Sequence, residues 1–151
     1  MKAKPRHLSE FLCFAIYSAN LAFGKAYKPM LEELGLTYTQ YITMVALSEE
    51  DDVTVSTLGD KLFLESNTLT PILKKLEAMG YVLRQRDAQD ERLVRVQLTP
   101  AGRKLREKAL TINSGLLEAT GLSPQEFARM QQGVVALRDS LVQATADAQG
   151  G

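Results

Sequence analysis

Both ends of the chain carry apolar residues that recur every three or four positions, which is the spacing of an amphipathic helix. The first of these segments runs from Leu12 to Met30, and Gly35 is a typical helix stop. The last segment begins with Ser123 and Glu126 at capping-box spacing. Its apolar stripe alternates by three and four, as in helices that pair with another helix. The pattern predicts two long terminal helices, with fraying over the final DAQGG.

Shorter periodic segments follow the first helix. Thr37 and Gln40 have capping-box spacing and predict a helix over about 38–47. Two further apolar sets predict two helices joined by a tight turn: Val55, Leu58 and Leu62, then Leu69, Leu73, Leu76 and Met79. Ser66 can cap the second of them, in which Pro71 is tolerated if the regular helix starts at about Thr68 and costly if it starts sooner. The pair has the outline of a helix-turn-helix.

Period-two alternation replaces the helical spacing in the next stretch. The segments YVLRQR and LVRVQL alternate as strands do, and the polar DAQDE between them predicts a hairpin with a long tip. Thr99 and Pro100 then form a cap followed by proline at the first helical position, opening a helix that reaches Gly121. The predicted fold class is mainly α with a small two-stranded β wing, a winged helix-turn-helix flanked by long helices.

Composition limits the class of protein. The chain has 151 residues, 45% of them apolar, and one cysteine, so it suits a single compact domain without a disulfide framework. It contains no secretion signal and no apolar run of about 18 residues, which predicts a cytoplasmic protein with no membrane partner. The formal net charge is zero, but residues 31–60 contain no Lys or Arg whereas residues 66–106 are rich in both. Any polyanion should therefore contact residues 66–106.

Motifs for catalysis and cofactor binding are absent from the sequence. There is no phosphate-binding glycine loop, no paired-histidine metal motif and no CxxC, and His7 is the one histidine, in a basic N-terminal arm. We therefore expect a protein that is not an enzyme, with no cofactor and no bound metal.

Two sets of residues are candidates for contact with double-stranded operator DNA. The second helix of the helix-turn-helix offers hydroxyls and amides for base edges and lysines for phosphates: Ser66, Asn67, Thr68, Thr70, Lys74 and Lys75. The hairpin offers Arg84, Arg86 and Arg92, which would project towards a minor groove. Asp90 lies two residues before Arg92 and can hold its guanidinium. By itself the helix is equally consistent with an amphipathic surface helix, and the hairpin favours DNA binding.

Cys13 lies in the apolar stretch FLCFAIYSAN. A lone cysteine in such a helix is ordinarily an inert small hydrophobe. Tyr17, four residues on, lies on the same helix face, and its hydroxyl could donate to a thiolate and favour the charged form. Because apolar surroundings oppose that charge, a reactive sulfur would need further donors from elsewhere in the chain.

Three segments together resemble one known family. They are LCFAIYSANLAFGKAYKPMLEELGLTYTQY, TLTPILKKLEAMGYV and RQRDAQDERLVRVQLTPAGRKL. They are similar to the MarR family of winged-helix repressors and, within it, to the organic hydroperoxide resistance regulators (OhrR), over about residues 8–106. The combination LCF…Y…AYKP…GLTY…QY is more specific than the winged helix, which MarR proteins of many functions share.

The resemblance implies a homodimeric repressor that releases DNA when Cys13 is oxidised by an organic hydroperoxide. It implies that Tyr27 and Tyr38 of the partner subunit donate to the thiolate, with Tyr17 close by. The expected organisation is one MarR-type domain over 1–151, with a DNA-binding core at 36–98 and dimerisation helices at 8–35 and 99–148. Because there is no second cysteine, oxidised Cys13 must end as a mixed disulfide with a small cellular thiol, a sulfenamide or an overoxidised acid.

Departures from the subgroup and rival interpretations remain. Glu65 and Asn67 stand where the subgroup commonly has Asp and Gly, so the operator sequence cannot be transferred. A repressor of the same fold could be released by a small aromatic ligand, with Cys13 only packing. A one-cysteine thiol peroxidase and a constitutive architectural DNA binder are two further possibilities.

Overall fold

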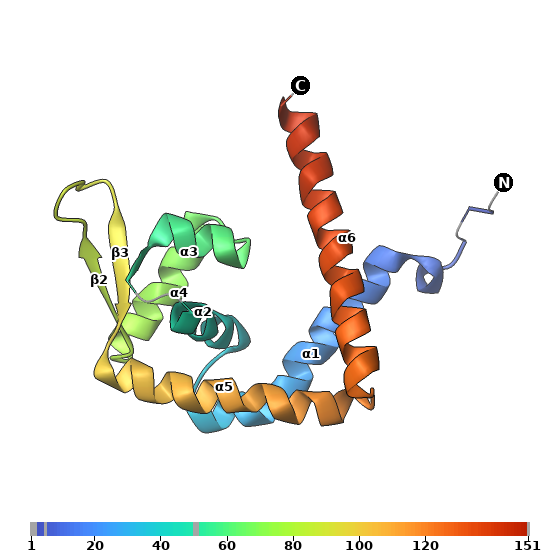
Figure 1. Cartoon of the computed structure of the whole chain (residues 1–151), viewed down its shortest axis with the longest axis horizontal. Coiled ribbons are helices and arrows are strands. Elements are labelled where there is room, and N and C mark those ends of the chain that lie inside the picture. Colours follow the sequence, from blue (N-terminus) through green and yellow to red (C-terminus); the bar gives the residue numbers. More distant parts are fainter. Residues whose placement is uncertain (1–2, 5, 50–51, 151) are drawn as a thin grey trace. The chain divides into compact units, whose positions relative to one another are not determined.

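The computed structural model describes residues 3–4, 6–49 and 52–150, which form two compact units, Met1–Ile112 and Asn113–Gly151 (Figure 1). The first unit holds most of the elements: η1 (Leu8–Glu10), α1 (Leu12–Leu34), α2 (Tyr38–Glu49), β1 (Val53–Thr54), α3 (Val55–Leu62), α4 (Ser66–Ala78), β2 (Val82–Arg86) and β3 (Val94–Leu98). Helix α5 (Pro100–Thr120) runs from the first unit into the second, which also holds α6 (Pro124–Gly150). The described part of the chain is thus mainly helical, as predicted.

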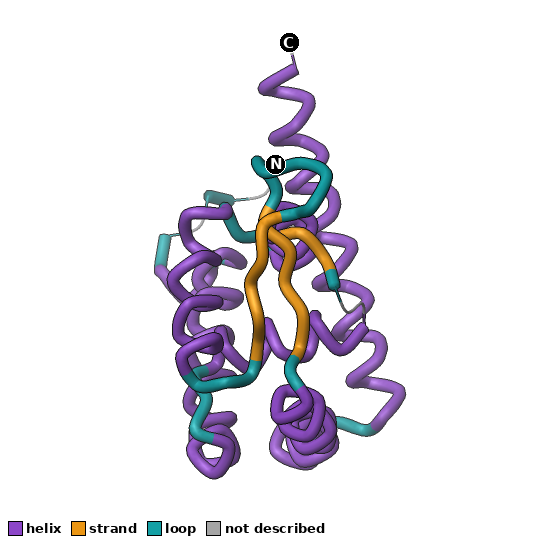
Figure 2. The backbone as a smooth tube through the Cα atoms, turned by 90° about the vertical axis from the view of Figure 1, so that its left-hand side faces the viewer, coloured by secondary structure: helices purple, strands orange, loops and turns teal. Residues whose placement is uncertain are grey.

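The sheet has three strands rather than the two expected. Strands β2 and β3 form the predicted antiparallel hairpin, with Val82 opposite Leu98. Strand β1 pairs antiparallel on the other side of β3, giving the order β1-β3-β2, with Val53 opposite Val96 (Figure 2). A two-residue strand is too short to produce the period-two pattern by which strands are recognised in a sequence. Its position is decided by pairing with β3.

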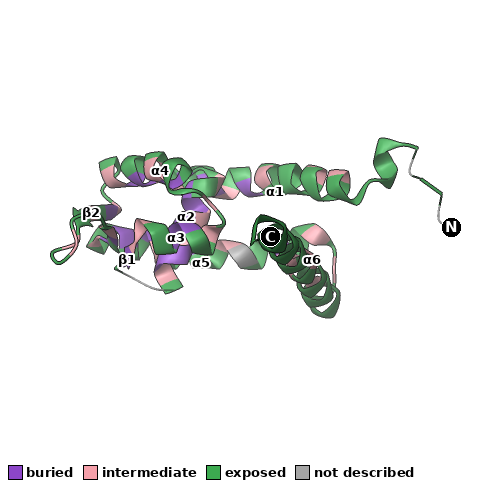
Figure 3. Cartoon of the chain, turned by 90° about the horizontal axis from the view of Figure 1, so that it is seen from above, coloured by how far each residue is buried: buried purple, intermediate pink, exposed green. Residues whose placement is uncertain are grey.

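The core of the first unit lies among α2, α3, α4 and the sheet. Burial is concentrated on these elements in Figure 3. The apolar side chains that are almost completely buried there are Met44, Leu47, Leu58, Leu69, Leu73, Leu76, Val82 and Val96. Every leucine predicted for the inner face of the second helix-turn-helix helix is in this set. Burial of this apolar surface is the main term that stabilises the fold.

Three predicted helix starts are confirmed by their caps. The Gln40 backbone N–H donates to the Thr37 hydroxyl (3.2 Å), and the Thr37 N–H donates back to Gln40 Oε1 (3.0 Å). Ser123 and Glu126 make the same reciprocal pair before α6. At the start of α5 the Gly102 N–H donates to the Thr99 hydroxyl. These bonds satisfy amides that have no partner within the helix.

The start of α4 differs from the prediction. The helix begins at Ser66, and Glu65 holds the cap position, because the Thr68 and Leu69 N–H groups both donate to the Glu65 carbonyl at 3.0 Å. The prediction of Ser66 as cap is therefore wrong. Pro71 lies inside the helix, where it lacks the N–H that would donate one turn back. Packing of α4 against the core stabilises the helix by more than the missing hydrogen bond costs.

Apolar residues of two helix segments remain exposed. The N-terminal half of α1 exposes Leu12 (62%) and Leu21 (51%), and α6, which is helical as far as Gly150 and not frayed over its tail, has no buried residue. On α6 Met130 and Leu141 are both 59% exposed. No helix in the described residues has the length and apolar character needed to span a bilayer.

Candidate DNA-binding surface and redox site

The turn between α3 and α4 fixes the direction of the predicted DNA-contacting helix. Phe63 adopts a left-handed conformation (φ 58°) at the end of α3, and the Leu64 N–H donates to the Gly59 carbonyl. A Cβ on Gly59 would lie 2.7 Å from the Leu64 oxygen, closer than real contacts allow. The turn therefore requires glycine at position 59, so that its chain can approach closely enough to orient α4.

The predicted DNA contacts of α4 lie on the face opposite the core. Five of the six side chains are exposed, namely those of Ser66, Asn67, Thr68, Lys74 and Lys75. Thr70 is half-buried, and its hydroxyl donates to the Ser66 carbonyl at 2.7 Å. The helix thus presents amide and hydroxyl groups at its N-terminal end and ammonium groups further along, which matches the docking of a recognition helix into a major groove.

The wing tip presents a positioned arginine. The Arg92 side chain is 89% exposed and donates two hydrogen bonds to Asp90, Nε to Oδ1 at 3.0 Å and an Nη to Oδ2 at 3.1 Å. This pair holds the pKa of Asp90 below its usual range. Arg86 donates to the Glu91 carbonyl at 2.8 Å. Because Asp90 already restricts the Arg92 guanidinium, less side-chain conformational entropy would be lost on binding to a phosphate or a groove edge.

Arg84 does not project from the wing as predicted. It lies in β2 on the same face as buried Val82, and its guanidinium donates to Glu77 of α4 at 3.1 Å. Its backbone N–H also donates to Glu77, at 3.0 Å, and together these bonds lower the pKa of Glu77. The sequence shows the alternation of the strand, but only the packing of α4 on β2 reveals the acid. Arg84 ties the wing to the recognition helix.

Arg95 makes a second tie that the sequence analysis missed. Its Nε donates to Asp52 at 2.9 Å, and an Nη donates to Asp87 at 3.2 Å. Asp87 also accepts the N–H groups of Gln89 and Asp90 at the hairpin tip. The arginine therefore connects the hairpin tip to the segment that leads into β1. Because 43 residues separate Arg95 from Asp52, no local pattern could have indicated the pair.

Cys13 and Tyr17 lie on the uncovered N-terminal half of α1. Both side chains are exposed, Tyr17 by 60%, and the Tyr17 ring lies 6.5 Å from that of Phe14. Tyr27 lies fourteen residues further along the same helix, which corresponds to about 21 Å of rise. Within one chain, therefore, Tyr27 is too far from Cys13 to donate to its sulfur.

Tyr27 and Tyr38 meet at the junction of α1 and α2, together with a third ring, that of Tyr41. The ring centroids of Tyr27 lie 5.3 Å from those of both Tyr38 and Tyr41, and the last two are 6.4 Å apart. Burial raises the pKa of all three phenols, that of Tyr27 the most. All three are therefore protonated hydrogen-bond donors at physiological pH. The family resemblance implied Tyr27 and Tyr38 as donors to the sulfur. Tyr41 was not among the predicted residues, although its place three residues after Tyr38 puts it on the same helix face.

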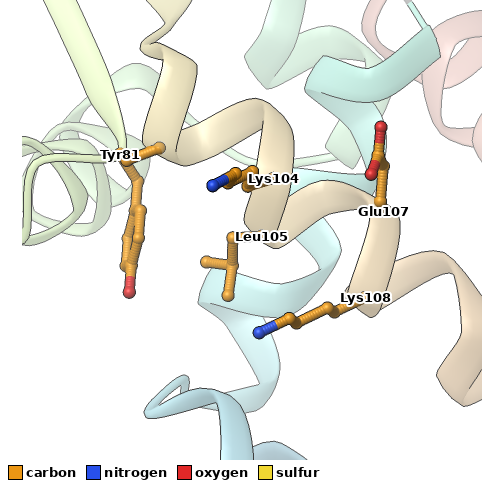
Figure 4. Close-up of a pocket in the computed structure, with 6 residues that line it drawn as sticks. Tyr81, Lys104, Leu105, Glu107 and Lys108 are labelled. Atoms are coloured by element: carbon orange, nitrogen blue, oxygen red, sulfur yellow. The ribbon is translucent and has the colours of Figure 1, made fainter.

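A cavity of about 420 Å³ lies at the start of α5. Tyr81, Leu105 and the chains of Lys104 and Lys108 line it, as Figure 4 shows, together with Ala101 and Glu107. Both lysines are exposed. Elsewhere, the described residues contain no cluster of histidine, cysteine and carboxylate groups that could hold a metal ion.

Comparison with known proteins gives consistent relatives. A family model described as transcriptional regulator SarA/Rot matches residues 25–109. The HTH-type transcriptional regulator TtmR of Methylorubrum extorquens is 42% identical over 91% of this chain and 70% of its own length. The organic hydroperoxide resistance transcriptional regulator of Bacillus subtilis is 37% identical over 90% of this chain and 92% of its own.

Solved structures of AbfR, a protein of Staphylococcus epidermidis, have the same fold. Reduced AbfR bound to DNA matches with a TM-score of 0.78 at 32% identity, over 91% of this chain and 94% of that one. Overoxidized AbfR bound to DNA matches at 0.73 and 33% identity, over 89% and 94%. Disulfide-formed AbfR matches at 0.63 and 35% identity, over 86% and 91%. The chain therefore belongs to the SarA/Rot family of transcriptional regulators, winged-helix proteins of the MarR type, and within them is similar to the organic hydroperoxide resistance regulators.

Proposed function

We propose that this regulator is a homodimeric repressor that releases operator DNA when an organic hydroperoxide oxidises Cys13. The observation that carries the proposal is the separation of the sulfur from its predicted donors. Cys13 is exposed on α1, and Tyr27 is buried about 21 Å further along the same helix. A second copy of the chain, with α1 running antiparallel to the first, would supply the phenols that one chain cannot.

The uncovered apolar residues support a dimer. Leu12, Ile16 and Leu21 are exposed on α1, as are Met130 and Leu141 on α6. Exposed apolar surface of this extent is unfavourable in water and is typical of an interface between subunits. In the dimer the terminal helices would bury these residues and hold two α4 helices at the spacing of successive major grooves.

The proposed sensing reaction occurs at the sulfur. The Cys13 thiolate attacks the terminal oxygen of the hydroperoxide, the O–O bond breaks, and the alkoxide takes a proton and leaves as an alcohol. Sulfur is oxidised to sulfenic acid and the peroxide is reduced. A small cellular thiol then condenses with the sulfenic acid, releasing water and leaving a mixed disulfide on Cys13. Because no second cysteine is present, the capping thiol must come from solution.

Three AbfR structures support a choice among the possible oxidised forms of Cys13. Reduced and overoxidized AbfR were both solved bound to DNA, and a disulfide form was solved as well. By analogy we propose that the mixed disulfide releases this regulator from DNA. A bulky group attached at position 13 would separate the packed helices further than added oxygen atoms would.

A gel-shift titration tests the proposal. Reduced protein is bound to a DNA fragment selected for affinity to it, then treated with cumene hydroperoxide or hydrogen peroxide, each with and without free cysteine. We expect release at much lower cumene hydroperoxide concentration, release that requires the free thiol, and no release of Cys13→Ser. Release of the Cys13→Ser protein by peroxide would disprove the proposal. Asn20→Ala, at an exposed position two turns further along α1, is the matched control and should be released as wild type is.

A second candidate is a repressor released by a small aromatic acid. The cavity beside Tyr81 has room for such a molecule, and the ammonium groups of Lys104 and Lys108 could donate hydrogen bonds to its carboxylate. The same titration, with benzoate in place of peroxide, separates the candidates. Release of both wild type and Cys13→Ser by benzoate would favour this one.

A further inference from the structure

Tyr41 is a buried polar side chain that the proposed sensing reaction has not used. It lies on α2, is only 6% exposed, and its ring is 5.3 Å from that of Tyr27. The two phenols interact at this short separation: the interaction raises the pKa of Tyr27 and opposes the effect of burial on the pKa of Tyr41. A phenylalanine at this position would fill the same space without burying a hydroxyl, which is costly unless it is bonded.

The backbone around Tyr41 is fixed on both sides. Its own N–H donates to the Thr37 carbonyl at 2.9 Å, within the first turn that the Thr37–Gln40 capping box closes. Tyr38 lies one turn before it, and their rings are 6.4 Å apart. Tyr41 is therefore held by a well-defined helix start, and it can in turn hold a neighbour in place.

We propose that Tyr41 is a positioning residue for peroxide sensing, whose hydroxyl holds that of Tyr27 at the point where the partner subunit's Cys13 thiolate arrives. This inference rests on the proposed function. Tyr41 acts through Tyr27 and does not contact the sulfur.

The numbers of protons and lone pairs on the Tyr27 and Tyr41 hydroxyls are consistent with this role. Each phenol has one proton to donate and lone pairs to accept with. When a thiolate is present, the Tyr27 proton turns to the sulfur and Tyr41 donates to the Tyr27 oxygen, so that the chain runs from Tyr41 through Tyr27 to the thiolate. No proton leaves either phenol, and the second bond strengthens the first by polarising it.

The experiment measures the rate at which iodoacetamide alkylates Cys13 in the full-length dimer, as a function of pH. For Tyr41→Phe we expect alkylation at neutral pH about two- to threefold slower than in wild type, the size expected from losing the cooperative part of a hydrogen bond to a charged group. The rate should reach half its maximum at a higher pH. Tyr41→Met, which also lacks the hydroxyl, should give the same shift.

A double-mutant cycle shows whether Tyr41 acts through Tyr27. In a Tyr27→Phe protein, adding Tyr41→Phe should slow alkylation no further, whereas in a Tyr38→Phe protein it should slow it by the same factor as in wild type. Unchanged alkylation in Tyr41→Phe would overturn the inference, and so would an equal slowing with and without Tyr27. Affinity of the reduced variants for DNA, which should match wild type, confirms that the fold is intact.

If the proposed function were wrong, the same experiments would give a different set of results. In that case the Tyr27→Phe protein would alkylate as fast as wild type, and the Cys13→Ser protein would still respond to peroxide in the gel shift. That outcome overturns the positioning role as well. Slow alkylation of Tyr27→Phe together with normal alkylation of Tyr41→Phe overturns only the role of Tyr41.

Discussion

The winged helix and the terminal helices differ in how far they bury their apolar residues. In the winged helix, Leu69, Leu73 and Leu76 of α4 have no exposed surface, whereas on α6 Met130 and Leu141 are each 59% exposed. The same kind of three-and-four spacing therefore produces a self-contained core in one region and an uncovered stripe in the other. The winged helix buries its apolar face within the chain, whereas α6 leaves its apolar stripe uncovered, as the proposed dimer would require.

The difference also separates the predicted DNA contacts from the proposed sensing residue. The side chains predicted to contact DNA are attached to the buried core, and the Glu77–Arg84 and Asp52–Arg95 pairs tie the wing to the rest of the chain. Cys13 lies on an uncovered helix instead. In the proposed dimer, a change at Cys13 would therefore act on the contacts between subunits and leave the shape of each winged helix intact.

The largest effect should come from charging the uncovered stripe of α6. Val134→Glu combined with Leu141→Glu would put carboxylates where the proposed interface excludes water, so the protein should become monomeric. Loss of the linked second half-site should weaken DNA binding about a thousandfold. Analytical ultracentrifugation and fluorescence anisotropy measure the two effects. Gln132→Glu with Gln143→Glu, on the polar face, is the matched control and should stay dimeric.

Shortening a side chain in the winged-helix core should lower the stability of the fold. Leu73→Ala removes a completely buried side chain and should reduce the free energy of unfolding by about 3 kcal/mol. Urea denaturation followed by circular dichroism measures it. Leu141→Ala, in solution dilute enough to contain monomer, should change the same quantity by less than about 0.5 kcal/mol. Equal losses from the two substitutions would contradict the division into a self-contained and an uncovered region.

Substitution of the wing arginines should have different effects on DNA binding and on stability, because Arg92 is exposed whereas Arg84 is bonded to Glu77. Arg92→Ala removes an exposed guanidinium and should weaken DNA binding about tenfold, with the salt slope of binding reduced by about one. Arg84→Ala should leave that slope almost unchanged and lower stability by about 1 kcal/mol, because it leaves Glu77 unpaired. Anisotropy titrations at several salt concentrations distinguish the two residues, and an identical loss of slope would show that Arg84 contacts DNA after all.

The smallest effect concerns the tie between wing and helix. The pKa of Glu77 in the folded protein lies below its ordinary value because Arg84 bonds the charged form. The stabilisation is therefore present above that ordinary value and is lost as the pH falls through the lowered one. Glu77→Gln should cost about 0.5 kcal/mol at neutral pH, since the pair is partly exposed. The difference from wild type should disappear in strong acid, as thermal unfolding across pH would show.

Much of the molecule followed from local patterns. The caps at Thr37, Thr99 and Ser123 were predictable because each satisfies amides only three residues away. The inner face of α4 and the β2–β3 hairpin were predictable because helical and strand periods are local properties of the chain. The Asp90–Arg92 pair was equally local. The start of α4 was mispredicted because the Glu65 carbonyl, not a side chain, accepts its first bonds.

The sequence by itself determined the winged helix and the polar face of α4, since each depends on neighbours within a few positions. Only the tertiary structure decided that β1 joins the sheet, that Arg84 and Arg95 act as ties, and that Tyr41 shares a cluster with Tyr27 and Tyr38. Except for Tyr38 and Tyr41, which lie one helical turn apart, these contacts join residues seven to more than forty positions apart. Contacts of that kind are selected by packing of whole elements, which no local pattern of hydrophobic and polar residues records.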